Sequence, residues 1–150
     1  MKKIVISLIV VALLAACAPA AEQSAGAPAE AALLVTVGET QKSLSAGDLQ
    51  ALPAAEATFK GVAYKGVTVS ALLEAISVDP AAIKALKAVA SDGFTVNYDP
   101  SQILKDNVLV AYALADGSGL PADDGSFRMV LPDEEGKLNV RMLVELQIIQ

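Results

Sequence analysis

Apolar and polar positions follow three different patterns along the chain. Residues 4–14 are apolar except for Ser7, and residues 18–32 are small or polar with no large apolar side chain. From Leu33 onward, short alternating or apolar runs are separated by glycine, proline and aspartate. Period-two alternation predicts strands, whereas apolar residues three and four positions apart predict helices. The three segments therefore have different expected roles.

Residues 33–150 are predicted to form one α+β domain that is mainly β. Strands are expected at 33–37, 41–44, 57–59, 86–90, 94–98, 108–114, 127–131 and 142–148. Short helices are expected between Ser45 and Pro53, at 69–76, after Asp79 and after Asp99. In the last strand, the residues expected to face the core are Met142, Val144, Leu146 and Ile148. Gly61 and Gly66 bracket a tight segment, which predicts backbone angles that other residues resist.

The N-terminal segment has the order of a signal peptide. Lys2 and Lys3 precede the apolar run, and small residues follow it. The run is shorter than the roughly 20 residues that span a bilayer, so it is expected to be removed. Leu14-Ala15-Ala16-Cys17 resembles the lipobox of bacterial lipoproteins, which implies cleavage before Cys17 and diacylglycerol on its thiol. Residues 1–16 are then the signal peptide, and residues 17–32 are the lipidated cysteine and a flexible tether. An ordinary secretory signal is the alternative.

Cleavage before Cys17 changes the charge of the mature chain. It leaves nine basic and seventeen acidic residues, a net charge of −8, with no histidine. Nucleic-acid binding depends on Lys and Arg that neutralise phosphates, so nucleic acid is not an expected partner. Anionic lipid would repel the chain, so acyl chains on Cys17 must supply membrane attachment. We expect export and, in a host with two membranes, anchoring to the outer membrane facing the periplasm, because Ala18 follows the cysteine.

Residues 59–74, with the sequence FKGVAYKGVTVSALLE, carry a family resemblance. They resemble the GV-aromatic-basic-GV step and LLE helix of the oxidoreductase molybdopterin-binding domain of the sulfite-oxidase type. Further motifs of that family follow in the same order at 91–94, 108–112, 119–121 and 127–132, with a closing strand at 140–148. The resemblance implies a sulfite-oxidase-like molybdopterin-binding domain fold, reduced in size.

The departures from that family concern its chemistry. The resemblance implies a cysteine that ligates molybdenum upstream of the aromatic step, but residues 52–59 read LPAAEATF. It also implies arginines and histidines that grip the pterin phosphate and the oxyanion substrate, whereas this chain has no histidine and only Arg128 and Arg141. The general export route moves unfolded chains, which does not suit a preloaded cofactor. We therefore expect no catalytic residue, no metal and no cofactor.

The predicted function is that of a membrane-anchored, non-catalytic module that binds a small ligand or an envelope protein. The residues predicted to contact a ligand are Phe59, Tyr64, Lys65 and Tyr112, with Lys65 at the family's basic position; core packing of the tyrosines is the alternative. A concave surface is expected near residues 59–65 and the loops after Ser91 and Asp116. Two other functions remain open: a molybdopterin-dependent oxidoreductase or redox-complex subunit that still binds the cofactor, and a purely structural envelope protein.

Overall fold

The computed structural model describes residues 31–150. The predicted signal peptide, Cys17 and most of the predicted tether lie outside the described residues. Within the part that is described, no helix is both long and apolar enough to cross a bilayer.

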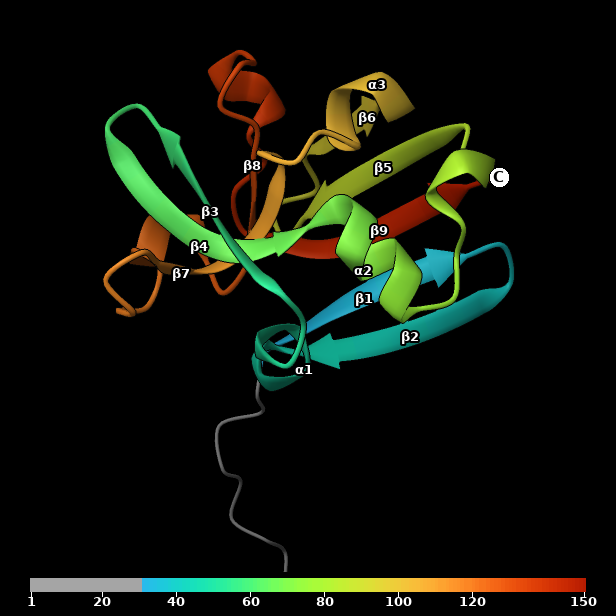
Figure 1. Cartoon of the computed structure of the whole chain (residues 1–150), viewed down its shortest axis with the longest axis horizontal. Coiled ribbons are helices and arrows are strands. Elements are labelled where there is room, and N and C mark those ends of the chain that lie inside the picture. Colours follow the sequence, from blue (N-terminus) through green and yellow to red (C-terminus); the bar gives the residue numbers. More distant parts are fainter. Residues whose placement is uncertain (1–30) are drawn as a thin grey trace, which may run out of the picture.

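In residues 31–150, nine strands form two sheets (Figure 1), in place of the roughly eight expected. The first sheet has the order β2-β1-β9-β5-β6. Its strands are β1 (Ala32–Val37), β2 (Thr40–Ser45), β5 (Ala85–Ala90), β6 (Thr95–Tyr98) and β9 (Leu143–Ile149). The second sheet has the order β3-β4-β7-β8. Its strands are β3 (Ala54–Phe59), β4 (Val62–Thr68), β7 (Leu109–Leu114) and β8 (Arg128–Val130). Among the strands of residues 31–150, β1 and β9 alone pair in parallel. Strands outweigh the short helices in this part of the chain, so the predicted mainly β, α+β architecture is confirmed.

The helices of residues 31–150 are short, and three of them begin at or beside residues where the sequence predicted a helix start. They are α1 (Ala46–Gln50), α2 (Val69–Ala75), α3 (Pro100–Ile103) and three 3₁₀ turns, η1 (Pro80–Ala82), η2 (Ala122–Asp124) and η3 (Gly136–Leu138). Ser45 and Asp48 form a capping box at α1, in which each side chain bonds the other's backbone N–H. The cap at Asp79 and the helix after Asp99 also lie where they were expected.

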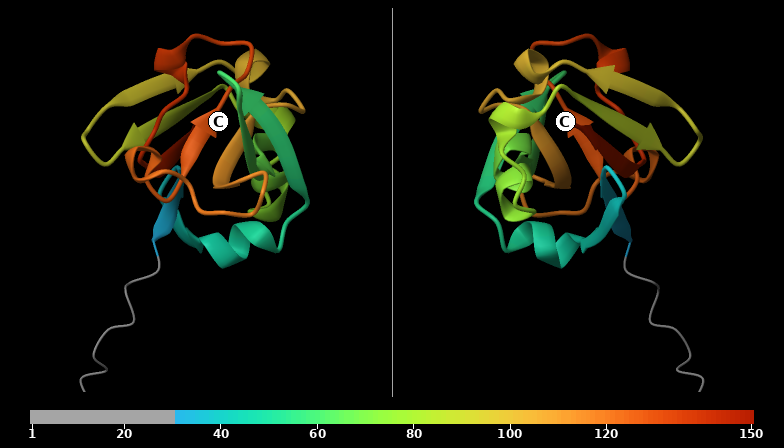
Figure 2. Two further views of the ribbon diagram at one scale, coloured as in Figure 1. Left: turned by 90° about the vertical axis from the view of Figure 1, so that its left-hand side faces the viewer. Right: turned by 90° about the vertical axis from the view of Figure 1, so that its right-hand side faces the viewer.

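The main core lies between the two sheets, and α2 closes one side of it (Figure 2). Leu33, Leu86 and Leu146 come from the first sheet, while Val67 and Met129 come from the second. A smaller apolar cluster lies on the opposite face of the second sheet, around Tyr64, Ala111 and Val130. That second face carries the site described below.

The expected orientation of the last strand is wrong in its first half. Leu146 and Ile148 are buried as predicted, but Met142 and Val144 are 40% and 39% exposed, and Leu143 is buried instead. The pairing of β9 with β5 shifts here, because Val89 faces Glu145 while Ala90 faces Leu143. Val144 is therefore the extra residue of a β-bulge, and such a bulge reverses the alternation of the residues before it.

The two glycines of residues 61–66 have different roles. Gly61 has a φ of +81° and follows Lys60, whose φ is +50°; these two residues connect Phe59 to Val62 in a tight hairpin turn, where positive φ is required. The expectation of an unusual backbone angle at Gly66 is wrong, because its φ is not positive. Gly66 instead lies against the backbone of β7.

Candidate anion-binding site

The four residues predicted to contact a ligand fall on two sides of the second sheet. Tyr64 and Lys65 are consecutive in β4, and successive side chains of a strand point to opposite faces. Phe59 and Tyr64 line one hollow, of about 400 Å³. Lys65 and Tyr112 line another, of about 370 Å³. The structure therefore brings the predicted residues together in two pairs.

The hollow beside Phe59 and Tyr64 gathers positive charge, and we call it the cationic hollow. Its functional side chains are Phe59, Lys60, Tyr64, Asp124, Arg128 and Arg141. Three of them are cationic and one is anionic, a formal charge of +2. Residues 31–150 as a whole carry nine basic and fifteen acidic residues, a net charge of −6. A concave site of one sign concentrates counter-ions of the other, so this hollow favours anions even though the domain repels them.

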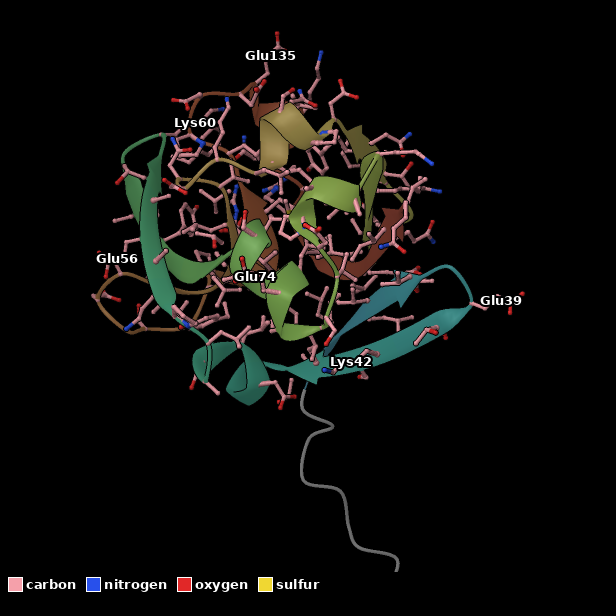
Figure 3. All side chains as sticks on the ribbon, turned by 45° about the vertical axis from the view of Figure 1, so that its right-hand side comes forward. Glu39, Lys42, Glu56, Lys60, Glu74 and Glu135 are labelled. Atoms are coloured by element: carbon pink, nitrogen blue, oxygen red, sulfur yellow. The ribbon has the colours of Figure 1, made fainter. Side chains whose placement is uncertain are left out.

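The β3–β4 turn places Lys60 at the rim of the cationic hollow. Its ammonium lies 5.4 Å from the centre of the Phe59 ring, within the range of a cation–π contact. Gly136 makes room for it, since a Cβ on Gly136 would lie 3.3 Å from Lys60 Nζ. Figure 3 shows Lys60 near Glu135, at the end of the domain opposite Lys42 of β2.

Arg128 forms the floor of the hollow and is held by a buried network. Its Nη1 donates to Asp124 Oδ1 at 2.8 Å and to the Tyr64 hydroxyl at 2.7 Å, and that hydroxyl donates to Asp124 Oδ2 at 3.3 Å. The Arg128 and Asp124 side chains are only 5% and 7% exposed. The guanidinium also stacks on the Tyr64 ring, with 4.5 Å between its Cζ and the ring centre. A buried ion pair is tolerated only when further hydrogen bonds, such as those that join Arg128 and Asp124 to the Tyr64 hydroxyl, compensate for the loss of water.

Two of the three guanidinium nitrogens of Arg128 bond within the described residues. The bonds to Asp124 and Tyr64 use Nη1, and a longer bond of 3.4 Å from Nε reaches Met129 O. Nη2 takes part in none of these bonds, and it is not fully buried, because no fully buried side-chain nitrogen or oxygen of the described residues lacks a partner. Arg128 lines the hollow, and a guanidinium is a group that recognises oxyanions.

The network also fixes the positions of its members. Burial raises the pKa of Tyr64 above its ordinary value, although the nearby charge of Arg128 acts against that rise. The Tyr64 hydroxyl donates to Asp124 Oδ2 and Arg128 Nη1 donates to Asp124 Oδ1, so each carboxylate oxygen accepts a hydrogen bond within the network. These bonds hold the Tyr64 ring and the Arg128 guanidinium beside the hollow.

Arg141 supplies the third cation, from the segment that enters β9. It is exposed and forms no ion pair with any described residue. The wall beside it is fixed by Asn139, whose amide bonds Leu131 N at 2.7 Å and Leu131 O at 3.1 Å. The Tyr98 hydroxyl also donates to Leu138 O, at 2.5 Å. These bonds hold the η3 segment in place beside the hollow.

Sequence reasoning missed the convergence of the two arginines. Arg128 and Arg141 were counted as too few to form a cluster, yet both line the cationic hollow. The signal was present in the order of the motifs, because Arg128 begins β8 and Arg141 lies two residues before the start of β9. No sequence pattern indicated Lys60 or Asp124.

The described residues do not fit a thiolate-held molybdenum centre. Residues 31–150 contain no cysteine, and β3 carries Ala, Glu, Thr and Phe where the family resemblance implies the ligand. Soft thiolate donors are what such a metal site uses, and the lysine and arginines of the cationic hollow are not metal donors. Within the described part of the chain, no three His, Cys, Asp or Glu side chains are grouped as metal ligands. The charge of the hollow would suit an anionic group without its metal.

Comparisons with known proteins define the family. The sequence matches the family described as the oxidoreductase molybdopterin binding domain over residues 28–150, so this chain belongs to that family. The crystal structure of the sulfane dehydrogenase SoxCD from Paracoccus pantotrophus is similar in fold, with a TM-score of 0.64 and 22% sequence identity. The likeness covers 79% of this chain and 38% of that one, so this chain spans well under half of that protein. A comparison with curated proteins finds none that matches.

Proposed function

We propose that this protein is a membrane-anchored, extracytoplasmic lipoprotein whose molybdopterin-oxidoreductase-like domain binds a small anion without catalysis. The observation that carries the proposal is the convergence of Lys60, Arg128 and Arg141 on one hollow in an acidic domain that lacks the metal-ligating cysteine. Fold alone does not define activity, so the proposal rests on this site.

The position of the cationic hollow supports the anchored arrangement. Ala32, where β1 begins, pairs with Ser45 beside α1, whereas Lys60 lies at the other end of the domain (Figures 1 and 3). Lipid on Cys17 would hold the N-terminal end of the domain toward the membrane. The cationic hollow would then face the aqueous compartment, where a soluble ligand can reach it.

Changing Cys17 to serine is expected to release the protein from membranes or leave it unprocessed, because a hydroxyl is not the thiol that carries diacylglycerol. Cell fractionation with an immunoblot measures this. The control, Ala20→Ser in the predicted tether, should stay with the membrane fraction. A Cys17→Ser protein that is cut at the same site and still sediments with membranes would contradict the anchor.

Anion binding can be measured by isothermal titration of the detergent-purified lipoprotein with inorganic phosphate. Lys60→Met and Arg141→Met should each weaken binding by about 1 kcal/mol, or roughly fivefold, because each removes one partly solvated charge contact. Lys87→Met makes the same change on β5, away from the hollow, and should have no effect. Unchanged phosphate affinity in both hollow variants would contradict the proposed site.

The alternative function is that of a molybdopterin-dependent oxidoreductase or redox-complex subunit. Membership of the family and the positive charge of the hollow, which would suit a phosphate-bearing cofactor, favour it. Metal analysis of the protein from its own host separates the two functions. We expect no molybdenum, and about one atom per chain would establish the alternative.

A further inference from the structure

In residues 31–150, no α-helix covers the outer face of the first sheet. Side chains on this face alternate along the strands with Leu33, Leu86 and Leu146, which point into the main core. Figure 2 shows α2 on the core side of the sheet and none of the three α-helices on the outer side. An antiparallel sheet can leave one face to water, so exposure alone indicates no partner. The charge pattern of this face is more informative.

Two neighbouring rows of side chains cross the outer face, and the register of the five strands defines them. The lysine row consists of Gln41, Thr36, Gln147, Lys87 and Asn97. The glutamate row consists of Ser43, Leu34, Glu145, Val89 and Thr95. Each row contains one charged residue, and the two charges are opposite. The rows are therefore neutral together, although residues 31–150 carry a net charge of −6. A second copy of the domain would not be repelled by these rows.

A two-fold axis between the rows would make this face complementary to itself. The axis runs across the strands, from β2 toward β6, and sets the lysine row of one copy against the glutamate row of the other. Lys87 then lies beside Glu145 of the partner subunit, and symmetry repeats the pair. Within one chain, Lys87 forms no ion pair with a described residue, and Glu145 accepts a bond from the Thr36 hydroxyl at 2.8 Å. Both charges are thus available to a partner.

The uncharged residues of the rows also fit this arrangement. Leu34 would lie against Thr36 of the partner subunit, and Val89 against the methylene stem of the partner's Lys87. All four residues are half-buried in the single domain. Two sheets that pack face to face lie about 10 Å apart, with their strands within about 30° of alignment. A two-fold axis across the strands produces this aligned kind of packing.

The area of the outer face matches a weak but specific dimer. Five strands spaced about 4.8 Å apart and about six residues long cover roughly 500 Å², or about 1,000 Å² for two copies. That area is at the lower limit of specific protein interfaces. Two copies held on one membrane meet at a high effective concentration, so a weak contact is sufficient there.

The same axis keeps both copies in the same orientation. The strands are stacked from β2, at the end of the domain where β1 begins, to β6 at the opposite end (Figure 1). Rotation about an axis along this direction leaves the first described residues of both copies at one end. Both lipid anchors of the proposed function could then enter one membrane. The cationic hollows are on the second sheet, so both would stay open.

We propose that the outer face of the first sheet is the interface of a symmetric dimer of this protein. The lysine row of each copy contacts the glutamate row of the other, and two pairs between Lys87 and the partner's Glu145 set the register. The dimer does not depend on anion binding, and the proposed anchor bears only on its orientation and local concentration.

Charge reversal tests the dimer in the full-length lipoprotein, by sedimentation velocity in density-matched detergent over a range of protein concentrations. Lys87→Glu and Glu145→Lys should each weaken dimerisation by about tenfold or more, because each turns two attractive pairs into two repulsive ones. The swap variant that carries both changes restores opposite charges and should dimerise nearly as the wild type does. The matched control is Lys42→Glu, which reverses an exposed charge of the same sheet outside both rows and should have no effect.

The outcomes are decisive for the dimer and leave the anion site untouched. A monomeric wild type, or a dimer that Lys87→Glu weakens no more than Lys42→Glu does, would overturn the proposed interface. A folded swap variant that stays monomeric would also overturn it. If the swap variant does not fold, Glu145→Gln keeps the shape and the bond from Thr36, and should weaken the dimer by about threefold; an unchanged dissociation constant would count against the interface. Phosphate titration of the same variants should give wild-type affinity, so loss of anion binding in the wild type would overturn only the proposed function.

Discussion

Replacing Gly66 with valine is expected to destabilise the domain by about 3 kcal/mol or more. A Cβ at this position would lie 2.2 Å from Val110 O and 2.6 Å from Ala111 Cα, both of which are backbone atoms of β7. Backbone cannot move aside as the end of a side chain can, so β4 and β7 would have to separate. Overpacking a well-packed site costs roughly 1–3 kcal/mol, and a clash with backbone belongs at the upper end or beyond it.

Urea unfolding measures this change as a shift in the midpoint and in the extrapolated free energy. Gly119→Val is the matched control, because nothing lies within 4 Å of its Cβ position and its φ is not positive. That change should stay within about 0.5 kcal/mol of the wild type. If Gly66→Val proved as stable as Gly119→Val, the close approach of β4 and β7 would be wrong.

The elements of the fold were predictable because local signals agree with the tertiary structure. Ser45 and Asp79 cap helices, and the two strands expected at 86–90 and 94–98 form as the antiparallel pair β5 and β6. The family motifs also appear in the expected order, and the family is confirmed by the match over residues 28–150.

The sequence-based expectations that proved wrong, for the start of β9 and for Gly66, concern places where two strands pair irregularly. The bulge at Val144 arises from the pairing of β9 with β5, and the close contact of Gly66 arises from a similar irregularity, at which Tyr112 is the extra residue of β7. Hydrophobic alternation within one strand carries no information on either.

Residues of the site that are close together in the sequence could be predicted, whereas those brought together by the tertiary structure could not. A hollow does lie near residues 59–65 and is lined by Phe59 and Tyr64, but neither the loop after Ser91 nor the loop that runs from Asp116 to η2 lines it. That Phe59 and Tyr64 contact a ligand there stays a prediction. Lys65 could not share that hollow with Tyr64, because strand geometry sends neighbouring side chains to opposite faces. Asp124, Arg128 and Arg141 converge through the η2 turn and the start of β9, which are tertiary features. Whether Lys65 and Tyr112 contact a ligand in their own hollow stays a prediction.

Replacing Arg128 with methionine is expected to destabilise the domain by about 3–5 kcal/mol. The change leaves the Asp124 carboxylate buried with the Tyr64 hydroxyl as its remaining partner, and an uncompensated buried charge carries a cost of this size. A domain of this size has a total stability of about 5–15 kcal/mol, so a substantial share would be lost. Lys105→Met is the control, since Lys105 pairs with Glu134 at 3.7 Å on the surface and should lose at most about 1 kcal/mol.

A double-mutant cycle shows whether the loss comes from the pair itself. Changing Asp124 to leucine together with Arg128→Met removes both charges, so the double variant should lie about 1–3 kcal/mol below the wild type, the cost of an unsatisfied Tyr64 hydroxyl. It should therefore be more stable than Arg128→Met alone, which additivity would not allow. Urea unfolding of the four proteins gives the coupling energy. If the two single losses simply added, Asp124 and Arg128 would act independently, and the buried network would not be what holds the floor of the cationic hollow in place.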